Sequence, residues 1–248
     1  MQGKNNCLEM FSCDCLSAGS KAMRAGGKSG RRRIAGIVLA AGTSTRMGCQ
    51  KLLLPWAQQN TILGTVLDVV ITAGLDQILV VSGSDRKEIE EIAHARGISS
   101  LVYNPNYLQG QSTSLQRGLS ALPAHTAAMF ILGDQPYITA RMLSALAAAY
   151  RQQGAKIVAP RTRDGYRGNP VVFSPALFSE LFALSGDIGG RNVIETHIDE
   201  ILYVDVSTDT VFEDLDTMEQ YLYARNRQIE KRTMSTAVRV SNKKTLPK

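Results

Sequence analysis

The chain has no apolar run long enough to cross a lipid bilayer. Its apolar segments extend over about 7 to 13 residues, against the roughly 18 to 20 that a membrane span requires. With 248 residues, of which 44% are hydrophobic and 20% charged, the chain can bury one substantial core. We therefore expect a water-soluble protein without a membrane partner.

Cysteine is scarce in the predicted core. Cys7, Cys13 and Cys15 lie near the start, and Cys49 lies alone in the body, so no pair indicates a structural disulfide. The single Cys-x-Cys pair lacks the four ligands of a usual zinc site. The first 20 residues also lack the charged start and the apolar run of a secretory signal. These absences favour a cytoplasmic protein.

The net charge of +6 hides an acidic central region. Residues 1–33 carry +5 and residues 227–248 carry +6, which leaves −5 for residues 34–226. Both basic segments lack apolar periodicity, so we predict two disordered tails around one domain at 34–226. Because the domain itself is acidic, nucleic acid is not an expected partner.

Strand and helix patterns alternate along the domain. Apolar runs predict strands at Ile34–Ala40, Gln77–Val81, Ser99–Tyr103, Ala127–Leu132, Ala155–Ala159, Val171–Phe173 and Ile201–Val206. Helical spacing predicts helices at 61–73, 85–96, 112–120, 139–150, 175–183, 191–197 and 215–225, with Asp85 as a cap. This alternation is typical of a doubly wound, mostly parallel α/β sheet, which binds ligands at the carboxyl ends of its strands.

A loop of small residues follows the first predicted strand. It runs from Leu39 to Gly48 as Leu-Ala-Ala-Gly-Thr-Ser-Thr-Arg-Met-Gly and continues to Lys51. Small residues let backbone N–H groups turn toward an anion, while Arg46 and Lys51 supply positive charge for a triphosphate. The spacing fits neither a Walker loop nor a dinucleotide fingerprint. The loop therefore predicts a phosphate site of another type.

Two acidic positions suit a magnesium ion. Asp134 follows the fourth strand in Gly-Asp-Gln-Pro, and Asp216 lies in Asp214-Leu-Asp-Thr217. Mg²⁺ prefers one or two carboxylates together with phosphate oxygens and water. Capping of the last helix is the alternative role for Asp214 and Asp216.

Seven motifs, in order along residues 34 to about 225, resemble the molybdenum cofactor cytidylyltransferases, MobA-like nucleotidyltransferases. Besides the loop and Gly133-Asp-Gln-Pro, they are Lys51-Leu-Leu-Leu-Pro, Gln109-Gly-Gln-Ser-Thr-Ser-Leu-Gln-Arg-Gly118, Tyr166-Arg-Gly-Asn-Pro-Val-Val-Phe173, Ser185-Gly-Asp-Ile-Gly-Gly-Arg191 and Asp214-Leu-Asp-Thr217. The resemblance implies a Rossmann-like nucleotidyltransferase fold that joins CMP from CTP to the phosphate of molybdopterin and releases pyrophosphate.

The same resemblance implies roles for individual residues. Arg46 and Lys51 would hold the triphosphate, and Asp134 and Asp216 would hold Mg²⁺, with Arg46, Lys51 and Asp134 as the catalytic set. The acceptor phosphate attacks in line, so no protein nucleophile is required. The residues assigned to the nucleotide are Leu39, Ala40, Ala41, Gly42, Ser44, Arg46, Lys51, Ser82, Gly83, Ser112, Ser114 and Asp134.

Base and acceptor contacts follow from the same motifs. Ala41 makes the loop resemble the cytidylyl branch, whereas guanylyltransferases carry Gly there. The residues assigned to the acceptor are Gly168, Asn169, Asp187 and Arg191, with Arg167 left open. Helix capping is the alternative role for Ser112 and Ser114, and a surface salt bridge is the alternative for Arg191.

Other functions remain open at this stage. The fold would also suit guanylyl transfer or a sugar-phosphate acceptor. A different class is a carrier that binds the finished dinucleotide and delivers it to a molybdenum hydroxylase. A carrier has no need of Lys51 and Asp134, so their presence favours the enzyme.

Overall fold

The computed structural model describes residues 31–57, 60–165, 167–207, 213 and 215–228. The two tails predicted from composition lie outside these residues over 1–30 and 229–248, and they stay predictions. The domain limits of 34–226 also stay a prediction; the first strand begins at Arg33, and the last helix extends to residue 228. Tyr166 and Asp214 of the sequence motifs also lie outside the described residues.

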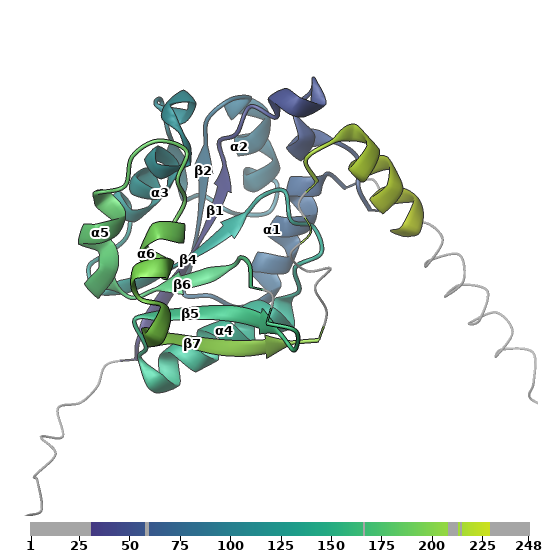
Figure 1. Cartoon of the computed structure of the whole chain (residues 1–248). Coiled ribbons are helices and arrows are strands. Elements are labelled where there is room, and N and C mark those ends of the chain that lie inside the picture. Colours follow the sequence, from purple (N-terminus) through teal and green to yellow (C-terminus); the bar gives the residue numbers. More distant parts are fainter. Residues whose placement is uncertain (1–30, 58–59, 166, 208–212, 214, 229–248) are drawn as a thin grey trace, which may run out of the picture. The chain divides into compact units, whose positions relative to one another are not determined.

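Seven strands form one sheet in the order β3-β2-β1-β4-β6-β5-β7 (Figure 1). They are β1 (Arg33–Ala40), β2 (Gln77–Ser82), β3 (Leu101–Tyr103), β4 (Thr126–Leu132), β5 (Ile157–Thr162), β6 (Val171–Phe173) and β7 (Ile201–Val206). Of these strands only β6 runs antiparallel to its neighbours, β4 and β5. The predicted mostly parallel α/β fold is confirmed, although the direction of β6 was not predicted.

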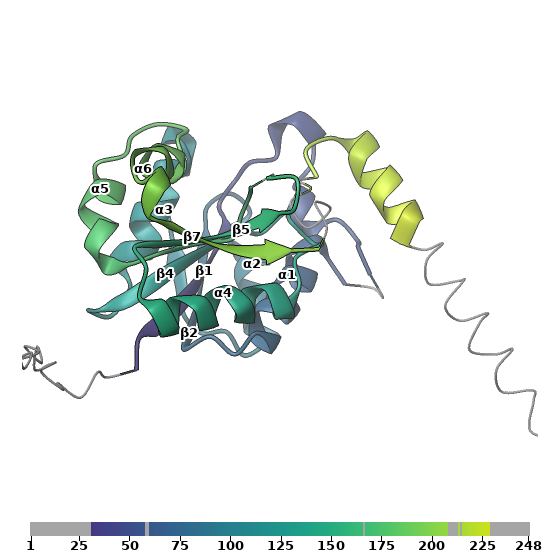
Figure 2. The same cartoon turned by 60° about the horizontal axis from the view of Figure 1, so that its bottom comes forward.

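Helices cover both faces of this sheet (Figure 2). One face packs against α1 (Ile62–Thr72), α2 (Arg86–His94) and α4 (Ala140–Gln153), and the other against α3 (Gln111–Ser120), α5 (Phe178–Phe182) and α6 (Arg191–Thr196). Successive side chains of a strand point to opposite faces. Accordingly Ile34 and Val38 of β1 belong to the first core and Ile37 to the second.

Local sequence explains where the helices begin. Thr61 accepts a hydrogen bond from Gly64 N at 3.0 Å, and Thr139 accepts one from Met142 N at 3.2 Å, so each caps its helix. The predicted cap at Asp85 is wrong. Asp85 has a φ of 49° and no capping bond, and its carboxylate instead accepts a hydrogen bond from the Gln50 amide.

The last helix covers residues 218–228, three residues later than its predicted start. Thr217 and Gln220 cap it reciprocally: Gln220 N donates to Thr217 Oγ1, and Thr217 N donates to Gln220 Oε1. Leu215 is buried, and Tyr221 Oη donates to Pro55 O at 2.6 Å. This anchoring brings the region around Asp216 close to the segment that follows β1, as the yellow-green helix in Figure 1 illustrates.

Other boundaries differ by a few residues. The predicted helix at 175–183 begins as a 3-10 turn at Pro175–Leu177 before α5, and the strand predicted at 155–159 lies at Ile157–Thr162. A sequence pattern locates the ends of helices and strands less precisely than their middles. Within the described ranges, no helix has the length and apolarity that a membrane crossing requires.

The strand order reverses at β1, which lies between β2 and β4. Loops that leave neighbouring parallel strands at such a switch point face each other. Leu39 pairs with Leu132, and Gly133 N donates to Leu39 O at 3.0 Å. A Cβ on Gly133 would lie 2.9 Å from that same oxygen, so a side chain there would disturb this close approach. The fold thus places Asp134 beside the loop that follows β1.

Candidate active site

The loop after β1 is held by Gln50. Its Nε2, which carries two hydrogens, lies within 2.8 to 3.0 Å of three acceptors, Gly42 O, Ser84 Oγ and Asp85 Oδ2, and its Oε1 accepts from Ser44 Oγ at 2.9 Å. Ser44 Oγ in turn accepts from the backbone N–H of Lys51. One amide therefore ties the loop to the segment after β2 and fixes where Lys51 begins its 3-10 turn.

Lys51 lies between two carboxylates. Its Nζ is 2.5 Å from Asp134 Oδ2 and 3.0 Å from Asp216 Oδ1. The Lys51 side chain is only 14% exposed. Burial alone lowers the pKa of an ammonium, but these carboxylates outweigh it and hold the pKa of Lys51 above its ordinary value. Lys51 is therefore positively charged across the neutral range.

Arg46 reaches the same cluster from the other side of the loop. Its Nη1 donates to Asp216 Oδ2 at 2.9 Å, while the side chain remains 75% exposed. The hydrogen bond from Lys51, together with the nearby charge of Arg46, lowers the pKa of Asp216. Helix capping, the alternative role weighed for Asp216, is performed by Thr217 and Gln220 instead.

A cavity of about 860 Å³, here called the loop cavity, opens above these charges. Most residues assigned to a nucleotide or a metal line it: Leu39, Ala41, Gly42, Ser44, Arg46, Lys51, Ser114, Asp134 and Asp216. Four assigned residues do not line it, namely Ala40, Ser82, Gly83 and Ser112. The structure thus brings the charged residues of the prediction together and leaves some small ones behind the cavity wall.

The small residues behind the wall have structural partners. Ser82 Oγ is buried and donates to Glu90 Oε1, and Ser112 Oγ donates to Gly186 O. Ser114 Oγ accepts from Asn104 Nδ2. None of the three caps a helix, so the alternative role considered for Ser112 and Ser114 is not observed.

Ala41 and Tyr107 form one corner of the loop cavity, and Gly83 lies behind them. A Cβ on Gly83 would lie 2.5 Å from Ala41 O, 2.7 Å from Ala41 Cβ and 2.8 Å from Tyr107 Cβ. Position 83 therefore has no room for a side chain while Ala41 and Tyr107 keep their places. The corner is closed by the methyl group of Ala41 and the aromatic side chain of Tyr107, both of which line the cavity.

A second cavity of about 600 Å³, here called the β6 cavity, adjoins the first. Gln111, Asn169, Asp187 and Arg191 line both cavities, together with Leu39 and Leu132. Gly168 lines the β6 cavity alone. The four residues assigned to an acceptor therefore surround the second cavity, and three of them stand at its border with the first.

The two arginine side chains of the β6 cavity, Arg167 and Arg191, differ in their contacts with other residues. Arg167 Nη1 donates to Tyr203 Oη at 2.8 Å, and the guanidinium carbon lies 5.2 Å from the centre of that ring. Arg191 has no hydrogen bond or ion pair within the described part of the chain, so the salt bridge weighed for it is not observed there.

Helix α6, which begins with Arg191, is held at its far end by His197. Nδ1 of His197 lies 2.8 Å from Glu200 Oε1, and Nε2 lies 3.0 Å from Glu180 on α5. The carboxylates of Glu200 and then Glu180 raise the pKa of His197. This histidine supports the helix from outside and lines neither cavity.

The donor set of the loop cavity fits a hard divalent cation only with help from a ligand. Asp134 and Asp216 supply two carboxylates that meet at one point, the Lys51 ammonium. No group of three His, Cys, Asp or Glu side chains suitable for a metal occurs in the described ranges. Mg²⁺ uses one or two carboxylates and completes its shell with phosphate oxygens and water, so these two residues suit it.

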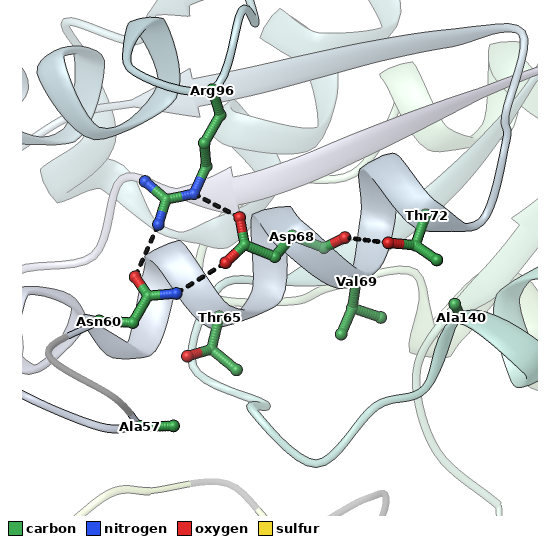
Figure 3. A pocket seen from close by; sticks show the side chains of 8 residues that line it. All are labelled: Ala57, Asn60, Thr65, Asp68, Val69, Thr72, Arg96 and Ala140. Carbon is green, nitrogen blue, oxygen red and sulfur yellow. Dashed lines mark hydrogen bonds and ion pairs between the residues drawn. The ribbon is translucent and has the colours of Figure 1, made fainter.

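A third cavity of about 540 Å³ lies elsewhere, along α1 (Figure 3). Arg96 donates to Asp68 Oδ1 and to Asn60 Oδ1, and Asn60 donates back to Asp68 Oδ2, all at 2.6 to 2.7 Å. These three side chains, which line the cavity, are thus hydrogen-bonded to one another. This set has one carboxylate for one cation, whereas Lys51 contacts two carboxylates.

Sequence reasoning missed several residues of the site. Gln50 organises the loop, Gln111 stands between the two cavities, and Tyr107 and Tyr203 supply aromatic walls. Gln50 carried one available signal, a long polar side chain inside a loop of small residues. Gln111 lies inside a quoted motif without having been assigned a role, and Tyr107 lies two residues before that motif. Tyr203 faces a cavity from a strand that showed only an apolar pattern.

Comparison with known proteins agrees with this geometry. Residues 36–201 match the family described as the MobA-like NTP transferase domain. The molybdenum cofactor cytidylyltransferase of Escherichia coli (strain K12) is 27% identical, over 78% of this chain and 96% of the relative. Nicotine blue oxidoreductase of Paenarthrobacter nicotinovorans is 25% identical, over 75% of this chain and 94% of the relative. Molybdenum cofactor guanylyltransferases are also among the relatives.

A solved structure extends the likeness to the fold. Rv0371c from Mycobacterium tuberculosis H37Rv, crystallised as a complex with manganese, superposes with a TM-score of 0.65 at 28% identity. The match covers 78% of this chain and 98% of that one. The neighbour's manganese shows that a relative with this fold accepts a divalent cation. Neither comparison separates cytidylyl from guanylyl transfer for this chain.

Proposed function

This chain belongs to the MobA-like NTP transferase domain family and is a nucleotidyltransferase, and we propose that it transfers CMP from CTP to molybdopterin. In this reaction a phosphate oxygen of molybdopterin attacks the α-phosphorus of CTP. The bond to the β-phosphate breaks and pyrophosphate leaves, so that molybdopterin cytosine dinucleotide is formed. The single observation that carries the proposal is the pair of adjoining cavities. Lys51 and Arg46, which are paired with carboxylates, line the first, and Arg167 and Arg191, whose side chains form no ion pair within the described residues, line the second.

The loop cavity is the proposed site of CTP. Arg46 and Lys51 would bind the triphosphate, and the N–H groups around Gly42 and Ser44 would turn toward its oxygens. Asp134 and Asp216 would hold Mg²⁺, which when bound supplies Lewis-acid charge next to the α-phosphate. Lys51 would neutralise charge on the departing pyrophosphate, a contribution that is greatest in the transition state.

The β6 cavity is the proposed site of molybdopterin. Its border residues Asn169, Asp187 and Arg191 lie where an acceptor phosphate must meet the nucleotide. Arg191 would bind that phosphate through paired hydrogen bonds. Arg167, which is hydrogen-bonded to Tyr203, would add a second positive charge. No His or Cys is found among the residues that line the two cavities, which suits direct attack by the acceptor.

The preference for cytosine rests on the corner at Ala41. The Ala41 methyl group lies against Gly83 and Tyr107, and it occupies volume that a Gly at 41 would leave open. A pyrimidine is smaller than a purine, so the filled corner favours CTP. Removing one methyl group from such a pocket changes discrimination by about 10-fold. Ala41→Gly is therefore expected to raise GTP use relative to CTP.

The decisive experiment uses purified protein with each of the four ribonucleoside triphosphates, Mg²⁺ and molybdopterin. Mass spectrometry of the product identifies the dinucleotide, and pyrophosphate is measured in parallel. The proposal expects the cytosine dinucleotide. A guanine dinucleotide would support the enzyme class and contradict the preference for cytosine. Pyrophosphate release only with a sugar phosphate would contradict molybdopterin as the acceptor. Delivery of the product to a molybdenum hydroxylase stays a prediction.

A further inference from the structure

Lys51 has the environment of a bound metal ion. Its ammonium is the shared partner of Asp134, which follows β4, and Asp216, which precedes the last helix. Asp134 has no other ion pair within the described residues. Two carboxylates that approach each other this closely repel unless a cation stands between them. Lys51 supplies that cation, at 14% exposure compared with 75% for Arg46.

The three carboxylates that line the loop cavity are not equivalent. Asp187 accepts a hydrogen bond from Gln111 N and lies at the border with the β6 cavity. Only Asp134 and Asp216 converge, and they converge on Lys51. A divalent cation that binds one oxygen of Asp134 and one of Asp216 must therefore either displace the Lys51 ammonium or bind with that positive charge only a few ångströms away.

We propose that Lys51 is a positioning residue as well as a phosphate ligand: it holds Asp134 and Asp216 together until the nucleotide's phosphates draw its ammonium away. This inference rests on the proposed function, because it takes the cation and the triphosphate as joint ligands of the loop cavity. A triphosphate offers Lys51 new anionic partners just as the carboxylates gain another cation. Cation and nucleotide then strengthen each other's binding, and the coupling is reciprocal.

Binding of Mn²⁺, followed by electron paramagnetic resonance of the free ion, tests this exchange without any acceptor or turnover. Lys51→Met keeps the length of the side chain and removes the charge, and Lys156→Met is the matched control because Lys156 pairs with Glu200 and lines neither cavity. Without nucleotide, Lys51→Met should bind Mn²⁺ about tenfold more tightly or better, since a nearby positive charge has been removed. Lys156→Met should match the wild type.

Nucleotide provides the second half of the test. Relative to the Mn²⁺ that the same triphosphate binds in the absence of protein, CTP or GTP should tighten Mn²⁺ binding to the wild type by about tenfold or more, and this gain should shrink in Lys51→Met. Lys51→Arg, which keeps a positive charge, should restore weak binding of Mn²⁺ alone. Equal or weaker binding of Mn²⁺ alone to Lys51→Met would overturn the proposal.

The wild type alone decides the matter if Lys51→Met fails to fold. Mn²⁺ that binds equally well with and without either triphosphate would contradict the exchange. Failure of the proposed function has a different signature, because the product assay then yields another dinucleotide or none while the coupling between Mn²⁺ and nucleotide persists.

Discussion

The two cavities hold positive charge in opposite ways. In the loop cavity Lys51 and Arg46 are both paired with carboxylates, and Lys51 is largely buried. In the β6 cavity Arg167 rests on a tyrosine, and Arg191 pairs with no group within the described residues. A paired cation must exchange partners when a phosphate arrives, whereas a free cation binds an anion with little rearrangement.

Because of this difference, we expect the residues of the two cavities to contribute differently to the reaction. Substitutions in the loop cavity should act on the rate, because under the proposed exchange its charges would change partners during the reaction. Substitutions in the β6 cavity should act on the affinity for the acceptor. The experiments below can break this division or sharpen it.

The largest effect is expected for Asp134→Asn. The change removes a carboxylate from the charged cluster but no core volume, so the fold should remain while transfer is lost by more than about 1,000-fold. Initial rates, circular dichroism and thermal melting measure both parts. Asp68→Asn is the matched control, because Asp68 also pairs with a cation but lines only the third cavity of Figure 3. Near-normal turnover in a folded Asp134→Asn protein would remove Asp134 from the metal site.

Lys51→Ala should slow CMP transfer by about 100- to 1,000-fold, as does the loss of one donor that stabilises charge in a transition state. Binding of the finished dinucleotide should change much less. Single-turnover rates with saturating CTP and molybdopterin provide the measurement. Equal rates, or a defect confined to affinity, would show that Lys51 acts in the ground state and would break the division between the cavities.

Arg191→Ala should raise the KM for molybdopterin by about 10- to 150-fold, the loss of one or two charge-assisted hydrogen bonds. The KM for CTP and the rate at saturating acceptor should stay near their wild-type values. Arg163→Ala provides the control, since Arg163 is exposed and lines neither cavity. A fall in rate at saturating acceptor would place Arg191 with the loop-cavity residues instead.

The smallest effect concerns His197, which holds α6 between Glu200 and Glu180. Its pKa is raised in the folded protein, so its stabilising effect is complete below the ordinary pKa of about 6.5 and is lost as pH rises through the folded value. The melting temperature of the wild type should therefore decline more above pH 6.5 than that of His197→Gln. Identical pH profiles for the two proteins would exclude this contribution.

The charged centre of the site was predictable because the strands place it. Arg46 and Lys51 follow one buried strand and Asp134 follows another, and parallel strands share their carboxyl edge. Asp216 was predicted as a ligand from its motif, and the structure brings it to the same ammonium. Short apolar runs also predicted the seven strands and their succession along the chain, because each strand has side chains in both cores and is therefore apolar on both faces.

The remaining features depend on contacts that no local pattern contains. Gln50 bonds to residues 8, 34 and 35 positions away, so its role arises only once the loop has closed. Asp85 was predicted as a cap because its residue type favours that position. Its backbone adopts a positive φ, however, and its carboxylate accepts a hydrogen bond from the Gln50 amide. Ser82 was assigned to the nucleotide, whereas its buried hydroxyl donates to Glu90 Oε1.

The reversed direction of β6 has a consequence for how such a protein diversifies. Because β6 is antiparallel to β4, with Phe130 opposite Val171, the residues just before β6 reach the same edge that the other strands reach at their ends. Gly168 and Asn169 thus enter the site through a connection that is separate from the loop holding Arg46 and Lys51. If the β6 cavity binds the acceptor as proposed, mutations in that connection would change the choice of acceptor and leave the loop that holds Arg46 and Lys51 unchanged.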